Sequence, residues 1–166
     1  MLTIKVFLDT NVLIDVLSVA ERPATEYSIR IFQEIRNFKL EGIITVQSVV
    51  DAAYAFRRDL RTQSLFRDRI LQIKNYVNLE SLNAFDLQDA LLSGTPDFED
   101  ELQYYHAYNA RCDYFITSDR KLLNRHHSSM MQICTPEDFV QKMKTMPLEE
   151  RTKGTLTPER TREAKD

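Results

Sequence analysis

Three short apolar segments of this chain are each followed by an aspartate. They are residues 3–8 (TIKVFL) before Asp9, residues 43–46 (IITV) before Asp51, and residues 114–116 (YFI) before Asp119. Short apolar runs of this kind predict strands buried on both faces, as in a parallel sheet. The carboxyl ends of parallel strands lie along one edge of the sheet, where α/β proteins place their sites. We therefore expect the three aspartates near one edge of the sheet.

The segments between these strands carry apolar residues at helical spacing. The helix that begins near Pro23 repeats apolar residues over positions 29–38, and Gly42 is positioned to end it. Other helices are expected at residues 11–17, 48–60, 65–77, 86–92, 96–110, 119–123 and 136–143, and further strands at residues 78–82 and 131–134. Alternating strands and helices predict a three-layer α/β fold around a parallel sheet.

The helix expected at residues 96–110 adds a second group of acids. Thr95 is expected to be its N-cap, and Asp97, Glu99 and Asp100 occupy its first turn. We interpret Asp97 and Glu99 as residues that complement the helix dipole, and Asp100 as a partner of the strand-end aspartates. The residues expected to face the core are Phe98, Leu102, Tyr105 and Tyr108.

Carboxylates that converge in this way need a positive partner. Two ionised carboxylates about 4 Å apart repel each other by roughly 4 kcal/mol at an effective dielectric constant of 20. Mg²⁺ and Mn²⁺ prefer oxygen ligands of this type, and such an ion can activate water for phosphodiester hydrolysis. The pattern therefore predicts a divalent-metal site at Asp9, Asp100 and Asp119, with Asp51 assisting.

The composition is that of an ordinary soluble protein. The 22 Lys and Arg residues against 25 Asp and Glu give a net charge of −3, which argues against a uniformly cationic nucleic-acid-binding surface. The two cysteines form no CxxC motif, so neither a disulfide scaffold nor a zinc ribbon is expected. No signal-peptide or membrane-spanning pattern is present, so we expect a cytoplasmic protein without membrane contact.

Polar segments are expected outside the core. One domain is expected over residues 1–147, followed by a polar, flexible tail over residues 148–166 that has very few apolar residues. His126 and His127 are expected in an exposed loop. His106 is expected on a helix surface or partly buried, and no histidine has the spacing of a zinc ligand.

Four segments, in order, resemble the motifs of PIN-domain nucleases. They are residues 6–15 (VFLDTNVLID), 97–103 (DFEDELQ), 112–119 (CDYFITSD) and 135–139 (TPEDF). Any one motif is modest, but the ordered set spans about residues 4–144 and is specific. The resemblance implies a three-layer α/β/α fold with roughly five parallel strands and Mg²⁺- or Mn²⁺-dependent cleavage of RNA. Many bacterial relatives are toxins that an antitoxin protein neutralises, often as homodimers.

The resemblance also implies a role for individual residues. The metal-binding carboxylates would be Asp9, Asp100 and Asp119, and the residues that support them would be Asn11, Asp97 and Thr117. Asp51 stands where the family usually has Glu in a Ser/Thr-x-x-Glu pattern, so its side chain is one methylene shorter. Ser118 replaces a residue that is often basic in relatives. These two departures leave open a weakly active or inactive PIN-like module that binds RNA or protein, and a nuclease specific for DNA structures such as flaps is a further alternative.

Two groups of side chains have both a functional and a structural interpretation. Arginines gather near the junction of two helices, at Arg57, Arg58, Arg61, Arg67 and Arg69. They either grip RNA phosphates or form a solvated helix face, and the solvated face is favoured. Tyr54 and Tyr105 either stack against bases or belong to the core, and we expect the core.

Overall fold

The computed structural model describes residues 3–125 and 129–146. Its five strands form one sheet in the order β3-β2-β1-β4-β5, and every neighbouring pair is parallel. The strands are β1 (Ile4–Leu8), β2 (Leu40–Thr45), β3 (Asn78–Glu80), β4 (Tyr114–Ile116) and β5 (Gln132–Cys134). The expected α/β fold with about five parallel strands is therefore confirmed.

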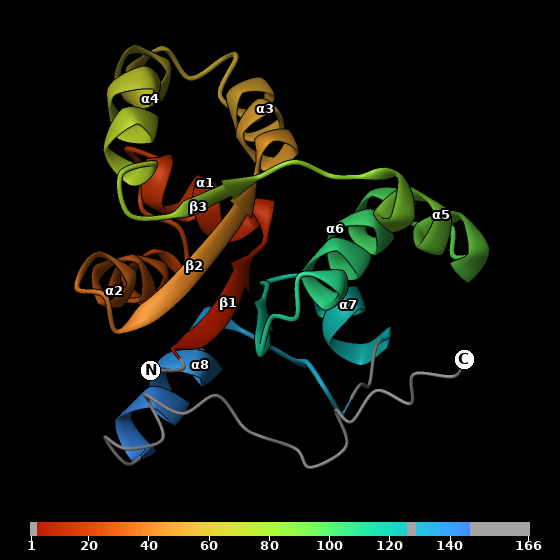
Figure 1. Ribbon diagram of the computed structural model, residues 1–166. Coiled ribbons are helices and arrows are strands. Elements are labelled where there is room, and N and C mark those ends of the chain that lie inside the picture. Colours follow the sequence, from red (N-terminus) through yellow and green to blue (C-terminus); the bar gives the residue numbers. More distant parts are fainter. Residues whose placement is uncertain (1–2, 126–128, 147–166) are drawn as a thin grey trace, which may run out of the picture.

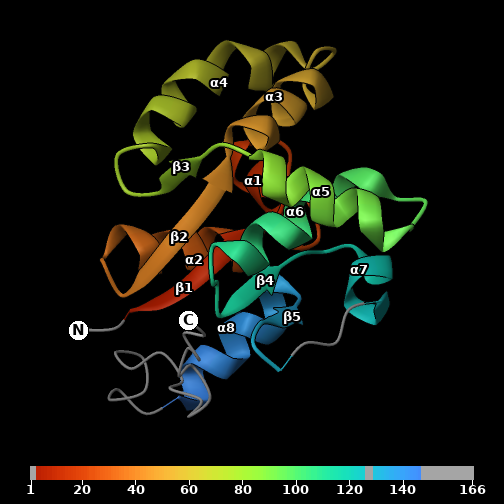
Figure 2. The same cartoon turned by 45° about the vertical axis from the view of Figure 1, so that its right-hand side comes forward.

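Helices cover both faces of this sheet (Figure 1). They are α1 (Thr10–Leu17), α2 (Thr25–Arg36), α3 (Val46–Ala55), α4 (Leu60–Ile73), α5 (Ala84–Ser93), α6 (Phe98–Asn109), α7 (Arg120–Arg125) and α8 (Pro136–Thr145). Helices α1, α2 and α8 pack on one face, and α6 and α7 pack on the other. Helix α5 packs along α6, outside the sheet (Figure 2).

The central strand β1 shows why the sheet needs both layers. Val6 and Leu8 are buried in one core with α1, α2 and α8, whereas Phe7, between them, is buried in the second core with α6 and α7. Successive side chains of a strand point to opposite faces, so an unbroken apolar run requires cover on both sides. Phe7 stacks on Phe115 of β4, with ring centroids 5.0 Å apart.

Gly42 does not end α2, contrary to the prediction. The chain turns instead at Phe38, whose backbone is left-handed with φ 58°. There the N–H of Lys39 donates to the Glu34 carbonyl at 3.0 Å, in the manner of a Schellman cap. Gly42 lies within β2, where a Cβ atom would come 2.5 Å from Ile35 Cδ1. The glycine thus serves the close approach of α2 to the sheet.

Helix α6 confirms only part of the predicted inward face. Tyr105 and Tyr108 are partly buried against the second core, whereas Phe98 and Leu102 are not fully buried. The buried residues are Glu101, Gln103, Tyr104, His106 and Ala107. The prediction assumed that apolar residues alone face inward, but three buried side chains here are polar and have partners. The helix begins after Asp97, so Thr95 is not its N-cap.

The remaining expectations concern the tail, the histidine loop, membrane-spanning segments and the cysteines. The predicted tail at residues 148–166 and the predicted loop at His126 and His127 lie outside the part of the chain that the structure describes. Within that part, no helix combines the length and apolar character needed to cross a membrane. Cys112 and Cys134 are buried free thiols, and burial raises the pKa of each to about 12.

Candidate active site

Asp9 and Asp119 follow neighbouring strands at the same edge of the sheet. Leu8 of β1 is in register with Ile116 of β4, and the N–H of Asp9 donates to the Ile116 carbonyl at 3.0 Å. Asp9 is the residue before α1, and Asp119 comes three residues after Ile116. The prediction that these acids meet at the carboxyl ends of the strands agrees with this geometry.

Thr117 holds both of these acids. Its hydroxyl donates to Asp9 Oδ2 at 2.7 Å and accepts a hydrogen bond from the N–H of Asp119 at 2.9 Å. Asp9 is only 4% exposed and does not cap α1 with its side chain. Burial raises the pKa of Asp9 to about 6, and repulsion from Asp119 adds to this, while hydrogen bonds from Thr117 and Asn11 oppose it. Two of the predicted supporting residues, Asn11 and Thr117, therefore act on Asp9.

Asp100 brings a third predicted acid to this edge from the first turn of α6. Burial raises its pKa to about 7, followed by repulsion from and hydrogen bonding with Asp97, and then by repulsion from Asp9 and Asp119. Asp100 thus lies within electrostatic range of both strand-end aspartates. Asp97, the N-cap residue of α6, makes no capping hydrogen bond with its side chain and lies 3.9 Å from Lys121 Nζ.

Glu99 and Asp51 extend the acidic group on the side of α3. The pKa of Glu99 is raised by burial first, then by repulsion from Asp51, and by repulsion from Asp9 and Asp97. Sequence reasoning assigned Glu99 only to the helix dipole, although its place beside Asp100 in the first turn was a signal. Asp51 Oδ1 accepts from Gln47 Nε2 at 2.8 Å. Asp51 Oδ2 is buried and has no hydrogen-bond partner among residues 3–125 and 129–146.

We call this acidic group the carboxylate cluster; it comprises Asp9, Asp51, Asp97, Glu99, Asp100 and Asp119. Its oxygen donors suit a hard divalent cation, and a cation would relieve the repulsion that raises the pKa of Asp9 and Asp100. Across residues 3–125 and 129–146, no three His, Cys, Asp or Glu side chains are close enough to hold a metal ion as they stand. The donor chemistry therefore fits a metal, and side-chain rotation would have to close the site around it.

The arginines near α3 and α4 divide into two kinds. Arg69 donates to the carbonyls of Leu17 and Ser18 at the end of α1, so it is a structural residue. The other four are exposed: Arg57, Arg58, Arg61 and Arg67. Tyr54 is 66% exposed, so the expectation that it belongs to the core was wrong. Tyr105 is partly buried against Tyr104.

His106 lies in a buried polar cluster rather than on a helix surface. It is only 4% exposed, and its Nδ1 and Nε2 atoms lie 2.7 Å from Asp86 Oδ2 and 3.0 Å from Glu80 Oε2. Burial would raise the pKa of Asp86, but hydrogen bonds from His106, Asn109 and the Asn83 N–H hold it below the ordinary value. The cluster joins β3, α5 and α6 and is separate from the carboxylate cluster.

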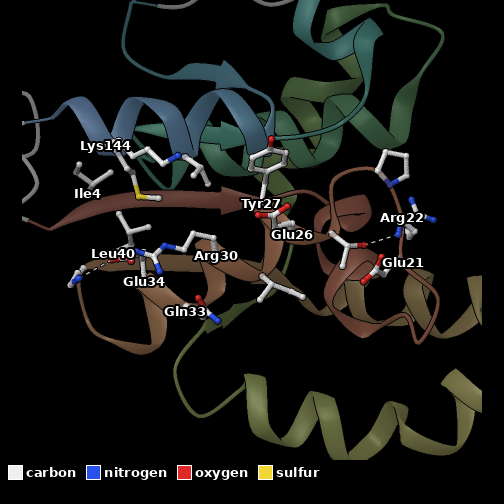
Figure 3. A pocket seen from close by; sticks show the side chains of 16 residues that line it. Ile4, Glu21, Arg22, Glu26, Tyr27, Arg30, Gln33, Glu34, Leu40 and Lys144 are labelled. Carbon is white, nitrogen blue, oxygen red and sulfur yellow. Dashed lines mark hydrogen bonds and ion pairs between the residues drawn. The ribbon is translucent and has the colours of Figure 1, made fainter.

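A cavity of about 790 Å³ lies elsewhere, between α2 and α8 and near the starts of β1 and β2 (Figure 3). Its lining includes Glu34, which pairs with Arg30 at 2.9 Å and with Lys39 at 3.1 Å. It shares no residue with the carboxylate cluster. Because its buried acid, Glu34, is already paired with two cations, it is a weaker candidate for chemistry than the acidic edge of the sheet.

The protein is thus an α/β protein with an acidic site. Its aspartates stand at two neighbouring strand ends and in the first turn of a packed helix. The family model described as PIN domain matches residues 5–121, more than half of the chain. The chain belongs to the PIN-domain family.

A solved structure shares this fold. VapC20 of Mycobacterium tuberculosis, described as a toxin that cleaves the sarcin–ricin loop, aligns with a TM-score of 0.55 and 11% sequence identity. The alignment covers 72% of the present chain and 95% of VapC20. No curated protein matches the chain in sequence.

Proposed function

We propose that this protein is a divalent-metal-dependent endoribonuclease, a hydrolase of phosphodiester bonds in RNA. The observation that carries the proposal is the approach of Asp9, Asp100 and Asp119, from three separate parts of the chain, to one edge of the sheet, where Asp119 raises the pKa of Asp9 and both of these acids raise the pKa of Asp100. Membership of the PIN-domain family supports the same activity. A role for Asp51 as a further acceptor is supported by its Oδ2 atom, which is buried and has no hydrogen-bond partner among the described residues.

Four residues of the carboxylate cluster have a part in this proposal. Asp9, Asp100 and Asp119 would hold Mg²⁺ or Mn²⁺, and Asp51 would assist. When bound, the ion supplies Lewis acidity and offsets the negative charge that develops on the phosphate. Thr117 orients Asp9 through its hydroxyl and fixes the backbone of Asp119. Lys121, which is exposed near Asp97, adds a positive charge at the rim.

The likeness to VapC20 supports a proposal about the binding partners of this chain. Because VapC20 is a toxin, we propose that this chain is the toxin of a toxin–antitoxin pair that acts on RNA in the cytoplasm and is neutralised by an antitoxin protein. A homodimer is proposed through the outer face of α5, whose exposed apolar residues are Phe85, Leu87, Leu91 and Leu92. Exposed apolar patches of this kind mark contact surfaces. A light-scattering mass of one chain would exclude the dimer.

A second candidate is a PIN-like binding module without catalytic activity. Two observations favour it: the described carboxylates do not form a closed metal site as they stand, and the short Asp51 side chain is held by Gln47. In this case RNA would bind at the same edge but would not be cleaved.

The deciding experiment is digestion of labelled single-stranded RNA by the purified protein with Mg²⁺, with Mn²⁺ and with EDTA, beside the Asp9→Asn variant. We expect cleavage that requires the metal and is lost in the variant. If the parent and Asp9→Asn cleave RNA at equal rates, Asp9 is not part of the catalytic site. If the parent binds RNA without cleaving it, the PIN-like binding module is favoured. A labelled DNA flap in parallel tests the substrate, because preference for the flap would exclude an RNA-specific enzyme.

A further inference from the structure

We propose that the end of α3 and the α3–α4 junction form a subsite for single-stranded RNA. The Tyr54 subsite, as we name it, consists of Tyr54, Arg57, Arg58 and Arg61. A base stacks on the Tyr54 ring, whose other face Arg57 covers, and the guanidinium groups of Arg58 and Arg61 contact the phosphates. This inference deepens the proposed function and rests on its RNA substrate, but it concerns binding rather than cleavage.

Tyr54 has the placement of a stacking residue rather than of a core residue. Its side chain is 66% exposed, although aromatic rings are usually buried to gain hydrophobic free energy. The Arg57 Cζ atom lies 3.9 Å from the centre of the ring, and Arg57 Nη1 donates to the Tyr54 carbonyl at 2.9 Å. One face of the ring is therefore covered by a fixed guanidinium, and the large remaining exposure is available to a nucleobase.

The subsite is joined to the carboxylate cluster by helix geometry. Residues three apart are neighbours on a helix surface, so Tyr54 lies one turn beyond Asp51, about 4.5 Å along the axis. Helix α3 starts at the carboxyl end of β2, the edge at which β1 also delivers Asp9, and its far end leads to α4 (Figure 1). A strand bound at the cluster can therefore continue over Tyr54 towards the junction.

The charges of the junction favour a polyanion. The chain has a net charge of −3, and the cluster itself repels phosphate, so a nucleic acid must be held where cations gather. Arg57, Arg58 and Arg61 are exposed within five residues, and Arg58 forms no ion pair in the part of the chain that the structure describes. The acid among them, Asp59, accepts hydrogen bonds from the Thr62 N–H and hydroxyl at the start of α4.

An exposed ring flanked by arginines selects the class of nucleic acid. Stacking needs a base whose face is free, as in single strands and loops, whereas paired bases are not accessible in this way. The Tyr54 subsite is therefore expected to prefer single-stranded over double-stranded RNA.

The test measures binding without catalysis. The anisotropy of labelled single-stranded RNA is followed in EDTA for the parent protein and for the Tyr54→Ala and Tyr54→Phe variants. The Kd is expected to rise about tenfold for Tyr54→Ala and to stay within about twofold of the parent value for Tyr54→Phe, because phenylalanine keeps the stacking face. Phe38→Asn removes an exposed aromatic residue from the turn before β2 and is the matched control, with no change expected.

The arginines are tested by salt dependence. Arg58→Gln and Arg61→Gln are each expected to weaken binding of all sequences alike and to reduce the slope of log K against log salt by about 0.7. Arg36→Gln, an exposed arginine at the end of α2, is the control and should leave the slope unchanged. Melting temperatures within experimental error of the parent confirm that the exposed variants fold.

The outcomes separate this inference from the proposed function. Tyr54-dependent RNA binding by a protein that never cleaves RNA with Mg²⁺ or Mn²⁺ would reject the nuclease and retain the subsite. Equal binding by the parent and Tyr54→Ala, or no RNA binding at all, would overturn the subsite even if cleavage occurs. Loss of binding in both Tyr54 variants would assign the contact to the hydroxyl and reject stacking. If Tyr54→Ala changes the mass of the protein in solution but not its affinity for RNA, the Tyr54 subsite is a contact between proteins.

Discussion

The Thr117 hydroxyl donates a 2.7 Å hydrogen bond to Asp9 Oδ2 from a fully buried position. The contact joins two neighbouring strand ends and fixes the carboxylate at the centre of the proposed site. A hydroxyl in this place selects one rotamer of the acid, which a metal ligand requires. The same oxygen accepts the Asp119 N–H, so Thr117 fixes the backbone that carries the second acid.

Loss of this hydroxyl should impair catalysis more than folding. Thr117→Val keeps the volume but leaves Asp9 without its donor, and metal affinity or activity is expected to fall about 10- to 100-fold, as for other residues that orient metal ligands. Thr117→Ser keeps the hydroxyl and should retain most activity. RNA cleavage rates against Mn²⁺ concentration measure both variants, and equal rates for Val and Ser would contradict the role.

The charge of Asp9 should destabilise the metal-free protein above pH 6. Burial raises its pKa from 3.8 to about 6, so the folded state binds more protons between these values and stability falls as the pH rises. Asp9→Asn removes this loss and should gain up to about 3 kcal/mol at pH 7–8, but little below pH 4. Urea unfolding in EDTA across this range measures the gain, and an equal gain at pH 4 and pH 8 would contradict the cause.

Asp51→Glu should strengthen the site. The longer side chain restores the residue usual in the resembled motif. It also extends the carboxylate by one methylene towards Glu99, whose pKa is already raised by the charges of Asp51 and Asp9. We expect a lower Mn²⁺ concentration for half-maximal cleavage, and Asp51→Ala should raise it. If Glu and Ala behave alike, Asp51 has no part in holding the metal.

The buried His106 cluster should dominate the stability of the α5–α6 pair. His106→Leu removes the 2.7 Å hydrogen bond between His106 Nδ1 and the buried Asp86 carboxylate, and leaving a buried polar group without such a partner typically costs about 1–3 kcal/mol, or more where the group is charged. Urea unfolding measures the loss. The Asp89→Asn variant, at a partly exposed residue that makes one contact with Asn109, should stay within about 0.5 kcal/mol of the parent. Adding Asp86→Leu to His106→Leu should recover part of the loss, and no recovery would show that the charge is not the cause.

The sequence predicts the parts of this molecule that follow from short-range rules. Apolar runs locate β1 and β4, and the parallel-sheet rule then places Asp9 and Asp119 at one edge. The face of α6 could not be predicted in the same way, because Gln103 and His106 are buried through contacts with Thr10 and with Asp86 and Glu80, which are distant in sequence. Apolar periodicity does not detect a helix face that is buried through polar partners.

Glu99 and Tyr54 show the same limit of prediction from sequence in two different ways. Glu99 stands in a helix first turn, where acids are common for local reasons, so its proximity to Asp51 becomes evident only once α3 and α6 are placed. Tyr54 lies four residues after Val50, as apolar residues on one helix face do, but the side chains of both are exposed. The sequence indicates which face of a helix is apolar, but not whether another element is available to cover it.

The absence of a side chain at Gly42 allows α2 to pack closely against the sheet. A methyl group there would come 2.5 Å from Ile35 Cδ1 and 3.1 Å from Ile35 Cγ1 and Cγ2, so the Ile35 side chain would have to rotate or α2 would have to move outward. Ser28 of α2 donates a 2.8 Å hydrogen bond to Asp15 of α1, the helix that begins immediately after Asp9. Gly42→Ala therefore tests whether the depth at which α2 packs is felt as far away as the acidic residues.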